Sequence, residues 1–215
     1  MSDRTTPKRI GTALGALACV MVACGGTLAG GDGGTGSDGG NVASGGGARV
    51  DGAFVSYGSC AGPGWCELVP LTCCGKCGVP ALGDMIAVNY NLTTVYRNDV
   101  CKGGTIPCPD CAAMDDPNLT AVCRQSTCRA VDVRTDTMSG CTVDDDCVLR
   151  AGNGCCESCA AVSPAELIAL SKTGLGELQS NVCHPDQGAC PPCVPQYPPN
   201  VVARCDPQTR HCFVK

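Results

Sequence analysis

The sequence predicts a small disulfide-rich fold, built as two tandem modules that each contain a short helix and a β-hairpin stapled by about five disulfides. First, the 215 residues include 22 Cys and only 3% aromatic residues, a composition typical of scaffolds whose apolar core is too small to stabilise the fold alone. Second, two sets of ten cysteines have nearly equal spacing. Third, the N-terminus predicts export to an oxidising compartment, where disulfides persist.

Residues 1–23 are predicted to be a lipoprotein signal peptide. Arg4, Lys8 and Arg9 precede fourteen mostly apolar residues, 10–23, that carry no charge. A basic segment followed by an apolar segment of this length is typical of an export signal, and it is too short to span a bilayer stably.

Cys24 is the predicted lipidation site. Met21, Val22 and Ala23 precede it, and together they resemble a bacterial lipobox, in which small residues precede a Cys that is diacylated and becomes the mature N-terminus. Cys19 is the competing position, as a poorer lipobox or as the end of an ordinary secretion signal. We favour Cys24 because it ends the apolar run. Its acyl chains, palmitate among them, would anchor the protein with about 0.8 kcal/mol for each buried CH₂, which predicts the cell envelope and, within it, the outer membrane.

Residues 24–52 are predicted to form a flexible tether that begins at the lipidated Cys. Nearly half of residues 25–52 are Gly, and Asp32 and Asp38 keep the segment solvated. A Gly-rich coil of this length has a root-mean-square reach of about 30 Å, which would hold the following residues clear of a membrane surface.

The spacing of the cysteines predicts the architecture of the remaining chain. Successive separations are 6, 7, 1, 3, 24, 7, 3, 12 and 5 residues in the first set and 6, 8, 1, 3, 24, 7, 3, 12 and 7 in the second. Ten cysteines do not fall into this register by chance, so we interpret the chain as a duplicated module, at residues 53–133 and 141–215 with a linker at 134–140. The cysteines predicted to form disulfides, whose pairing stays open, are Cys60, Cys66, Cys73, Cys74, Cys77, Cys101, Cys108, Cys111, Cys123 and Cys128, and Cys141, Cys147, Cys155, Cys156, Cys159, Cys183, Cys190, Cys193, Cys205 and Cys212.

One helix is predicted in the second module. Residues 163–166 have the pattern of a capping box with Pro164 at the first helical position, so we expect a helix over about 164–171, ending near Gly174. The first module lacks this cap, and residues 83–84 predict only a shorter turn of helix.

Each module is predicted to close with a β-hairpin. Residues 119–133 and 201–214 both read as a strand, a polar turn and a second strand, which is the pattern of a hairpin. Elsewhere Pro and Gly are dense enough to predict loops.

The sequence CCGKC at residues 73–77, which returns as CCESC at 155–159, allows three kinds of chemistry. Structural disulfides are favoured because each set holds an even ten cysteines in an exported chain. Neighbouring cysteines bond to each other only through a strained ring, so each adjacent pair is expected to link one point of the chain to two others. Each bridge stabilises by about 2–4 kcal/mol.

Metal binding and thiol–disulfide exchange are the two alternatives. Cys-x-x-Cys pairs bind Zn²⁺ through thiolates, but export removes the reducing environment and leaves six further Cys in each module unexplained. Exchange needs an exposed Cys of low pKa at a helix N-terminus, and no βαβ pattern surrounds the pairs at 108–111 and 190–193. We therefore expect neither a metal site nor a cofactor.

Other candidate residues give weaker signals. The acidic run 144–146 could bind Ca²⁺, although a solvated turn is the favoured interpretation. His184 and His211 are predicted to be surface residues, and Trp65 is predicted to cover the small core or else to form an exposed contact. With only two His and one Trp in the chain, the sequence offers little for an active site, and we do not expect an enzyme.

The acidic composition limits the class of partner. The formal charge of −5 and the isoelectric point near 4.9 disfavour nucleic acid, which calls for a basic surface. The predicted partners are the membrane, through the lipid, and an unidentified protein or glycan. The sequence leaves the oligomeric state open.

Two motifs link the chain to a known group. These are W-C-x-L-V-P-x-x-C-C-G-x-C at residues 65–77 and C-x-x-D-x-D-C at 141–147. With the lipobox and the Gly-rich tether, they resemble predicted Cys-rich lipoproteins of myxobacterial genomes over nearly the whole chain. The resemblance implies an envelope location and brings no biochemical activity.

The function expected from the sequence is that of a lipid-anchored cell-envelope protein with two extracytoplasmic binding or structural modules. The alternative is a protease inhibitor, whose inhibitory loop would lie in the long Cys-to-Cys segments 78–100 or 160–182. A Cys-based metal-binding protein is a less favoured third interpretation.

Overall fold

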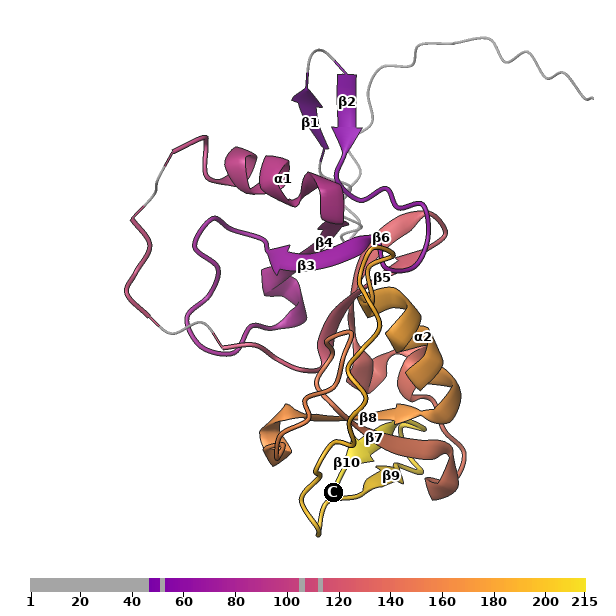
Figure 1. The fold of residues 1–215 in the computed structure, drawn as a ribbon. Coiled ribbons are helices and arrows are strands. Elements are labelled where there is room, and N and C mark those ends of the chain that lie inside the picture. Colours follow the sequence, from indigo (N-terminus) through magenta and orange to yellow (C-terminus); the bar gives the residue numbers. More distant parts are fainter. Residues whose placement is uncertain (1–46, 51–52, 105–106, 112–113) are drawn as a thin grey trace, which may run out of the picture. The chain divides into compact units, whose positions relative to one another are not determined.

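The computed structural model describes residues 47–50, 53–104, 107–111 and 114–215 (Figure 1). The predicted signal peptide, Cys24 and residues 25–46 of the predicted tether lie outside the described residues. Strand β1 (Gly47–Val50) falls within the last part of the predicted tether and pairs antiparallel with β2 (Ala53–Ser56). A hairpin therefore precedes the first cysteine set.

Two further hairpins and one helix carry the first cysteine set. Strands β3 and β4 pair antiparallel, with Cys66 opposite Asn89, and β5 pairs antiparallel with β6, with Cys123 opposite Cys128. The 3₁₀ helices η1 (Leu82–Asp84) and η2 (Tyr90–Leu92) flank β4. The elements in chain order are β3 (Cys66–Pro70), β4 (Met85–Asn89), α1 (Thr93–Val100), β5 (Leu119–Arg124) and β6 (Thr127–Asp132).

The same order of elements surrounds the second cysteine set. The hairpins β7–β8 and β9–β10 flank one helix, and the 3₁₀ helices η5 (Asp144–Asp146) and η6 (Pro164–Glu166) precede β7 and β8. The elements are β7 (Cys147–Ala151), β8 (Leu167–Ser171), α2 (Lys172–Val182), β9 (Ala203–Cys205) and β10 (Cys212–Val214).

The prediction of a helix over 164–171 is wrong. Ser163 and Glu166 do form a capping box, but it opens the single turn η6. Leu167–Ser171 then forms β8, all of whose residues are buried, and a strand buried on both faces has the same continuous apolar run as a buried helical segment. The helix α2 starts after Ser171, whose hydroxyl accepts a hydrogen bond from the Gly174 N–H at 3.0 Å.

The other predicted elements agree more closely with the structure. The turn predicted near residues 83–84 is η1, and the hairpins predicted over 119–133 and 201–214 are confirmed as β5–β6 and β9–β10. Helix α1, the hairpin β3–β4 and strand β7 occupy segments predicted as loops. Each module had been expected to hold one hairpin, and two hairpins surround each cysteine set.

Residue Val122 of β5 connects the two cysteine sets through packing. It is fully buried in a cluster with Ile168 and Leu170 of β8 and Leu178 of α2. Helix α2 accordingly contacts β5 as well as β8 (Figure 1). One apolar cluster is therefore built from both sets.

The segment 134–140, predicted as a polar linker, takes part in the same cluster. It contains parts of the 3₁₀ helices η3 (Val133–Thr135) and η4 (Thr137–Ser139), and Met138 and Ser139 are fully buried. The Met138 carbonyl accepts a hydrogen bond from the Ser171 hydroxyl at 3.0 Å. Tyr57 has the equivalent position in the first set, since it lies three residues before Cys60 as Met138 lies three before Cys141. It is also buried, and its carbonyl accepts a hydrogen bond from the Asn89 N–H at 2.7 Å.

We expect Gly174→Ala to destabilise the fold, because a Cβ there would lie 1.8 Å from the Met138 carbonyl oxygen. Overpacking of this kind costs about 1–3 kcal/mol. Gly176→Ala in the same helix is the matched control, since nothing lies within 4 Å of a Cβ there and Ala is favoured over Gly in helices by about 1 kcal/mol. Guanidinium denaturation of the oxidised proteins should move the two midpoints in opposite directions, and equal midpoints would contradict the close packing of α2 on Met138.

Candidate functional site

The ten disulfides follow one pairing order in both cysteine sets. The first Cys bonds to the ninth, the second to the tenth, the third to the sixth, the fourth to the seventh and the fifth to the eighth. The bridges are Cys60–Cys123, Cys66–Cys128, Cys73–Cys101, Cys74–Cys108 and Cys77–Cys111, and Cys141–Cys205, Cys147–Cys212, Cys155–Cys183, Cys156–Cys190 and Cys159–Cys193.

The adjacent pair Cys73 and Cys74 reaches in two directions, as predicted. Cys73 bonds to Cys101, the C-cap of α1, whereas Cys74 bonds to Cys108 in the loop that follows. In the second set Cys155 likewise bonds to the C-cap of α2. The motif therefore fixes the end of a helix and the next loop to one point of the chain.

Neighbouring bridges place sulfurs close enough to suggest a metal site. Cys73, Cys74 and Cys108 form one such group, with all three sulfurs within 4.8 Å of one another, and Cys155, Cys156 and Cys190 form the equivalent group. Zinc binds thiolates, and every sulfur in these groups belongs to a disulfide. In this oxidised form the sulfurs act as cross-links.

The number of disulfides indicates the compartment. Ten bridges in a chain of this size fit an exported, extracytoplasmic protein, because thiols stay reduced in the cytosol. Within the part of the chain that the structure describes, no helix combines the length and the apolar character that crossing a bilayer requires.

Two carboxylates of the acidic run 144–146 accept hydrogen bonds that stabilise a turn. Asp146 accepts hydrogen bonds from the Thr142 hydroxyl at 2.7 Å and from the Thr142 N–H at 2.8 Å, and these lower the pKa of its carboxyl. Asp144 accepts from the Cys205 N–H at 2.9 Å and from Arg204 at 2.6 Å, which lowers the pKa of Asp144 as well. Asp144 thus joins η5 to β9 and Asp146 binds the residues just before η5, so two of the three carboxylates are less available for a calcium site.

His184 is not the plain surface residue that was predicted. Its ring centroid lies 4.3 Å from that of Tyr90 and 5.4 Å from that of Trp65, and its Nε2 is buried with no hydrogen-bond partner among the described residues. Gly64 adopts a φ of +80°, and a Cβ there would lie 2.2 Å from the Cys183 carbonyl oxygen. Trp65 packs against the small core, which was the favoured of its two predicted positions. It also contacts His184, which belongs to the second set.

His211 is half-buried and pairs with a serine. The Ser139 hydroxyl lies 2.8 Å from His211 Nδ1 and 3.0 Å from the Asp136 carbonyl oxygen. A serine nucleophile must be reachable by its substrate as well as close to a base, but Ser139 is fully buried. The contact joins η4 to the residue before β10.

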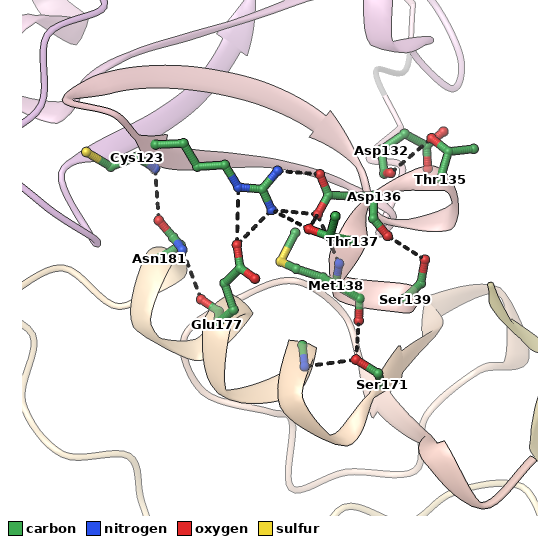
Figure 2. A network of polar contacts seen from close by, with 12 residues as sticks. Cys123, Asp132, Thr135, Asp136, Thr137, Met138, Ser139, Ser171, Glu177 and Asn181 are labelled. Carbon is green, nitrogen blue, oxygen red and sulfur yellow. Dashed lines mark hydrogen bonds and ion pairs between the residues drawn. The ribbon is translucent and has the colours of Figure 1, made fainter. Parts of the chain in front are cut away.

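Arg124 of β5 lies at the centre of a network of polar contacts, whose members Asp136, Glu177 and Asn181 are labelled in Figure 2. Its guanidinium donates two hydrogen bonds of 2.6 Å to the two carboxylate oxygens of Asp136, and a further one of 2.7 Å to Glu177 of α2. The Asn181 amide oxygen accepts from the Cys123 N–H at 2.9 Å. The network ties β5 to α2 and to the segment before η4, around the shared apolar cluster.

The charges in this network shift both pKa values toward the ionised forms. Burial alone would raise the pKa of Asp136, but the bidentate guanidinium and the Met138 N–H outweigh it and hold that pKa below its ordinary value. The hydrogen bonds from Arg124 to Asp136 raise the pKa of Arg124. Since the Asp136 side chain is only 9% exposed, this ion pair is screened less than an ordinary surface pair.

Comparison with protein families, with curated proteins and with solved structures finds no match to this chain.

We expect Asp136→Asn to lower the free energy of unfolding by about 2 kcal/mol at pH 7, the range for hydrogen bonds to charged groups. A depressed folded-state pKa contributes stability above the unfolded value, about 3.9 for Asp, and that contribution is lost as pH falls through the folded value. The difference between the two proteins should therefore shrink below about pH 4. Glu177→Gln is the control, with a small effect because Glu177 is 39% exposed. A pH-independent difference would contradict the ion pair.

We also expect the disulfides to differ in how much each stabilises the fold. Loss of Cys60–Cys123 by a double change to Ala should destabilise by about 1–2 kcal/mol more than loss of Cys77–Cys111, because Cys60 is buried in the core and both cysteines of the second bridge are exposed. The loop-closure contribution differs little, since the sequence separations are 63 and 34. Denaturation midpoints, after alkylation has verified that no free thiol remains, measure the difference. Equal losses would show that chain entropy alone governs both bridges.

Proposed function

We propose that this chain is a lipid-anchored cell-envelope protein whose two disulfide-rich modules form a rigid scaffold for binding. The observation that carries the proposal is the identical pairing order of the two cysteine sets, with sequence separations of 28, 34 and 34 for the last three bridges of each. Equal order of pairing and of elements supports duplication of one module. The lipid anchor at Cys24 is supported by the sequence of residues 1–24.

Binding suits a framework of this kind better than catalysis does. Loops cross-linked at several points lose little conformational freedom when a partner docks, so less affinity is spent on ordering. In the Ser139–His211 pair, which has the spacing of a nucleophile and a base, the serine is fully buried. We therefore propose a non-enzymatic role, with a protein or glycan as the partner.

The protease-inhibitor alternative has less support. An inhibitory loop has to present an exposed, extended segment to the enzyme. The segments in which it was expected, 78–100 and 160–182, contain β4 with α1 and β8 with α2. All residues of β8 are buried, so this strand is not available to an enzyme.

The anchor is tested by changing each candidate cysteine separately. We expect Cys24→Ser to abolish acylation, seen by mass spectrometry of the extracted protein, and to release the chain from the membrane fraction. Cys19→Ser is the matched control and should keep both the acyl mass and the membrane attachment. The reverse pattern would assign the lipid to Cys19, and attachment of both variants would contradict a lipid anchor at either position.

A further inference from the structure

Each cysteine set buries one long polar side chain that hydrogen-bonds the loop before its adjacent cysteines. In the first set this side chain is Tyr96 of α1, which is 5% exposed, and in the second it is Arg150 of β7, which is fully buried. The two side chains come from different elements, a helix and a strand. Two core positions have therefore exchanged roles between the sets.

These two positions occupy equal places in the cysteine spacing. One lies on the first strand of the hairpin, three residues after the second Cys, and the other lies on the helix, five residues before its C-cap Cys. At each position one set has the long polar side chain and the other has a smaller aliphatic one. The corresponding residues are Val69 and Arg150 on the strands, opposite Ile86 and Ile168 in register, and Tyr96 and Leu178 on the helices.

In the first set the helix supports the loop. The Tyr96 hydroxyl lies 3.1 Å from the Leu71 carbonyl oxygen and 3.3 Å from that of Pro70. Val69 is 1% exposed and packs in the same cluster as Tyr96. The hydroxyl therefore binds the start of the loop, two residues before Cys73.

In the second set the strand supports the loop. Leu178 is fully buried and offers no donor, whereas Arg150 Nη2 donates to the carbonyl oxygens of Gly154 and, at 3.2 Å, of Cys155. Its Nε and Nη1 are buried without a hydrogen-bond partner among the described residues, and no ion pair in that part of the chain involves it. A buried charge with so few partners is costly, so Arg150 calls for a structural reason that a tyrosine on α2 would not meet.

The length of the second loop supplies that reason. The two loops begin alike, because the Leu71 N–H donates to Asp84 at 2.9 Å and the Gly152 N–H donates to Glu166 at 2.8 Å. The second loop then has one more residue before its adjacent cysteines, since the spacing is eight instead of seven. In this longer part, the Asn153 side chain donates to the Leu119 carbonyl oxygen of β5.

We propose that Arg150 replaces Tyr96 as the support of this loop because the second loop also has to hold Asn153 against the first set. Tyr96 binds the start of its loop, whereas Arg150 binds the end, on the far side of Asn153. Arg150 is thus a positioning residue for the contact between the sets. This inference goes beyond the proposed function and depends neither on the lipid nor on a binding partner.

Reversal of the exchange in the second set tests whether the two positions act together. Arg150→Val leaves loop carbonyls unpaired and Leu178→Tyr overpacks the core, so each should raise the equilibrium constant for unfolding about tenfold or more. Independent effects would multiply to about a hundredfold, whereas we expect less than about tenfold for the double variant, in which the tyrosine fills the space that the arginine leaves. The double variant with Phe at 178 has no hydroxyl and should recover about fivefold less. Arg129→Val, at an exposed arginine of β6, is the control and should change little.

A second comparison tests the role of Arg150 at the contact. Asn153→Ala should raise the equilibrium constant for unfolding about fivefold in the natural chain, the value for one hydrogen bond, and less than about twofold when Arg150→Val is already present. This coupling would be absent if Arg150 only filled space in the core.

Guanidinium denaturation of the oxidised proteins measures these constants, and peptide mapping without reductant verifies the ten disulfides of each variant. If Arg150→Val alone does not fold, a folded double variant with Tyr at 178 still demonstrates the exchange. Losses that multiply, or equal recovery by Phe and Tyr at 178, would overturn the shared role of the two positions. An equal effect of Asn153→Ala in both backgrounds would overturn the role at the contact.

Discussion

The bridges that leave residues 73–77 constrain the structure more than any apolar contact does. Cys73 fixes the end of α1, and Cys74 and Cys77 fix the loop that follows the helix. The buried apolar clusters are small, the largest having six fully buried residues, so packing alone would order few of these loops. Because the same constraint returns at residues 155–159, the residues between the bridges are free to differ.

The two cysteine sets contribute different surfaces to the contact between them. β5 offers Val122 and Arg124 to α2 and the segment before η4. At the corresponding steps of the cysteine spacing, the second set has Arg204, whose side chain is 49% exposed and pairs with Asp144, and Asp206. The face of β9 that carries these charges cannot receive another helix in the way β5 does.

Some features were readable from the sequence, and the reasons are physical. The cysteine register, the hairpin over 119–133 and the capping box at Ser163 depend on local patterns. The exclusion of a vicinal bridge at Cys73–Cys74 depends on ring strain. The disulfide pairing, the strand at 167–171 and the burial of His184 depend on which distant segments meet, and a fully buried strand carries no alternation that would distinguish it from a helix.

The position of Val122 bears on how this chain reaches its final form during export. Secretion delivers the chain from its N-terminus, so β5 enters the oxidising compartment before α2 does. Until then Val122 lacks the cover of Leu178 and Arg124 lacks Glu177, although Asp136 is already present and Cys123 is already available to Cys60. The first five bridges can close early, but the hairpin that carries two of them acquires its full packing only when α2, which ends at Val182, has arrived. Translocation and tertiary assembly are thereby coupled at one strand.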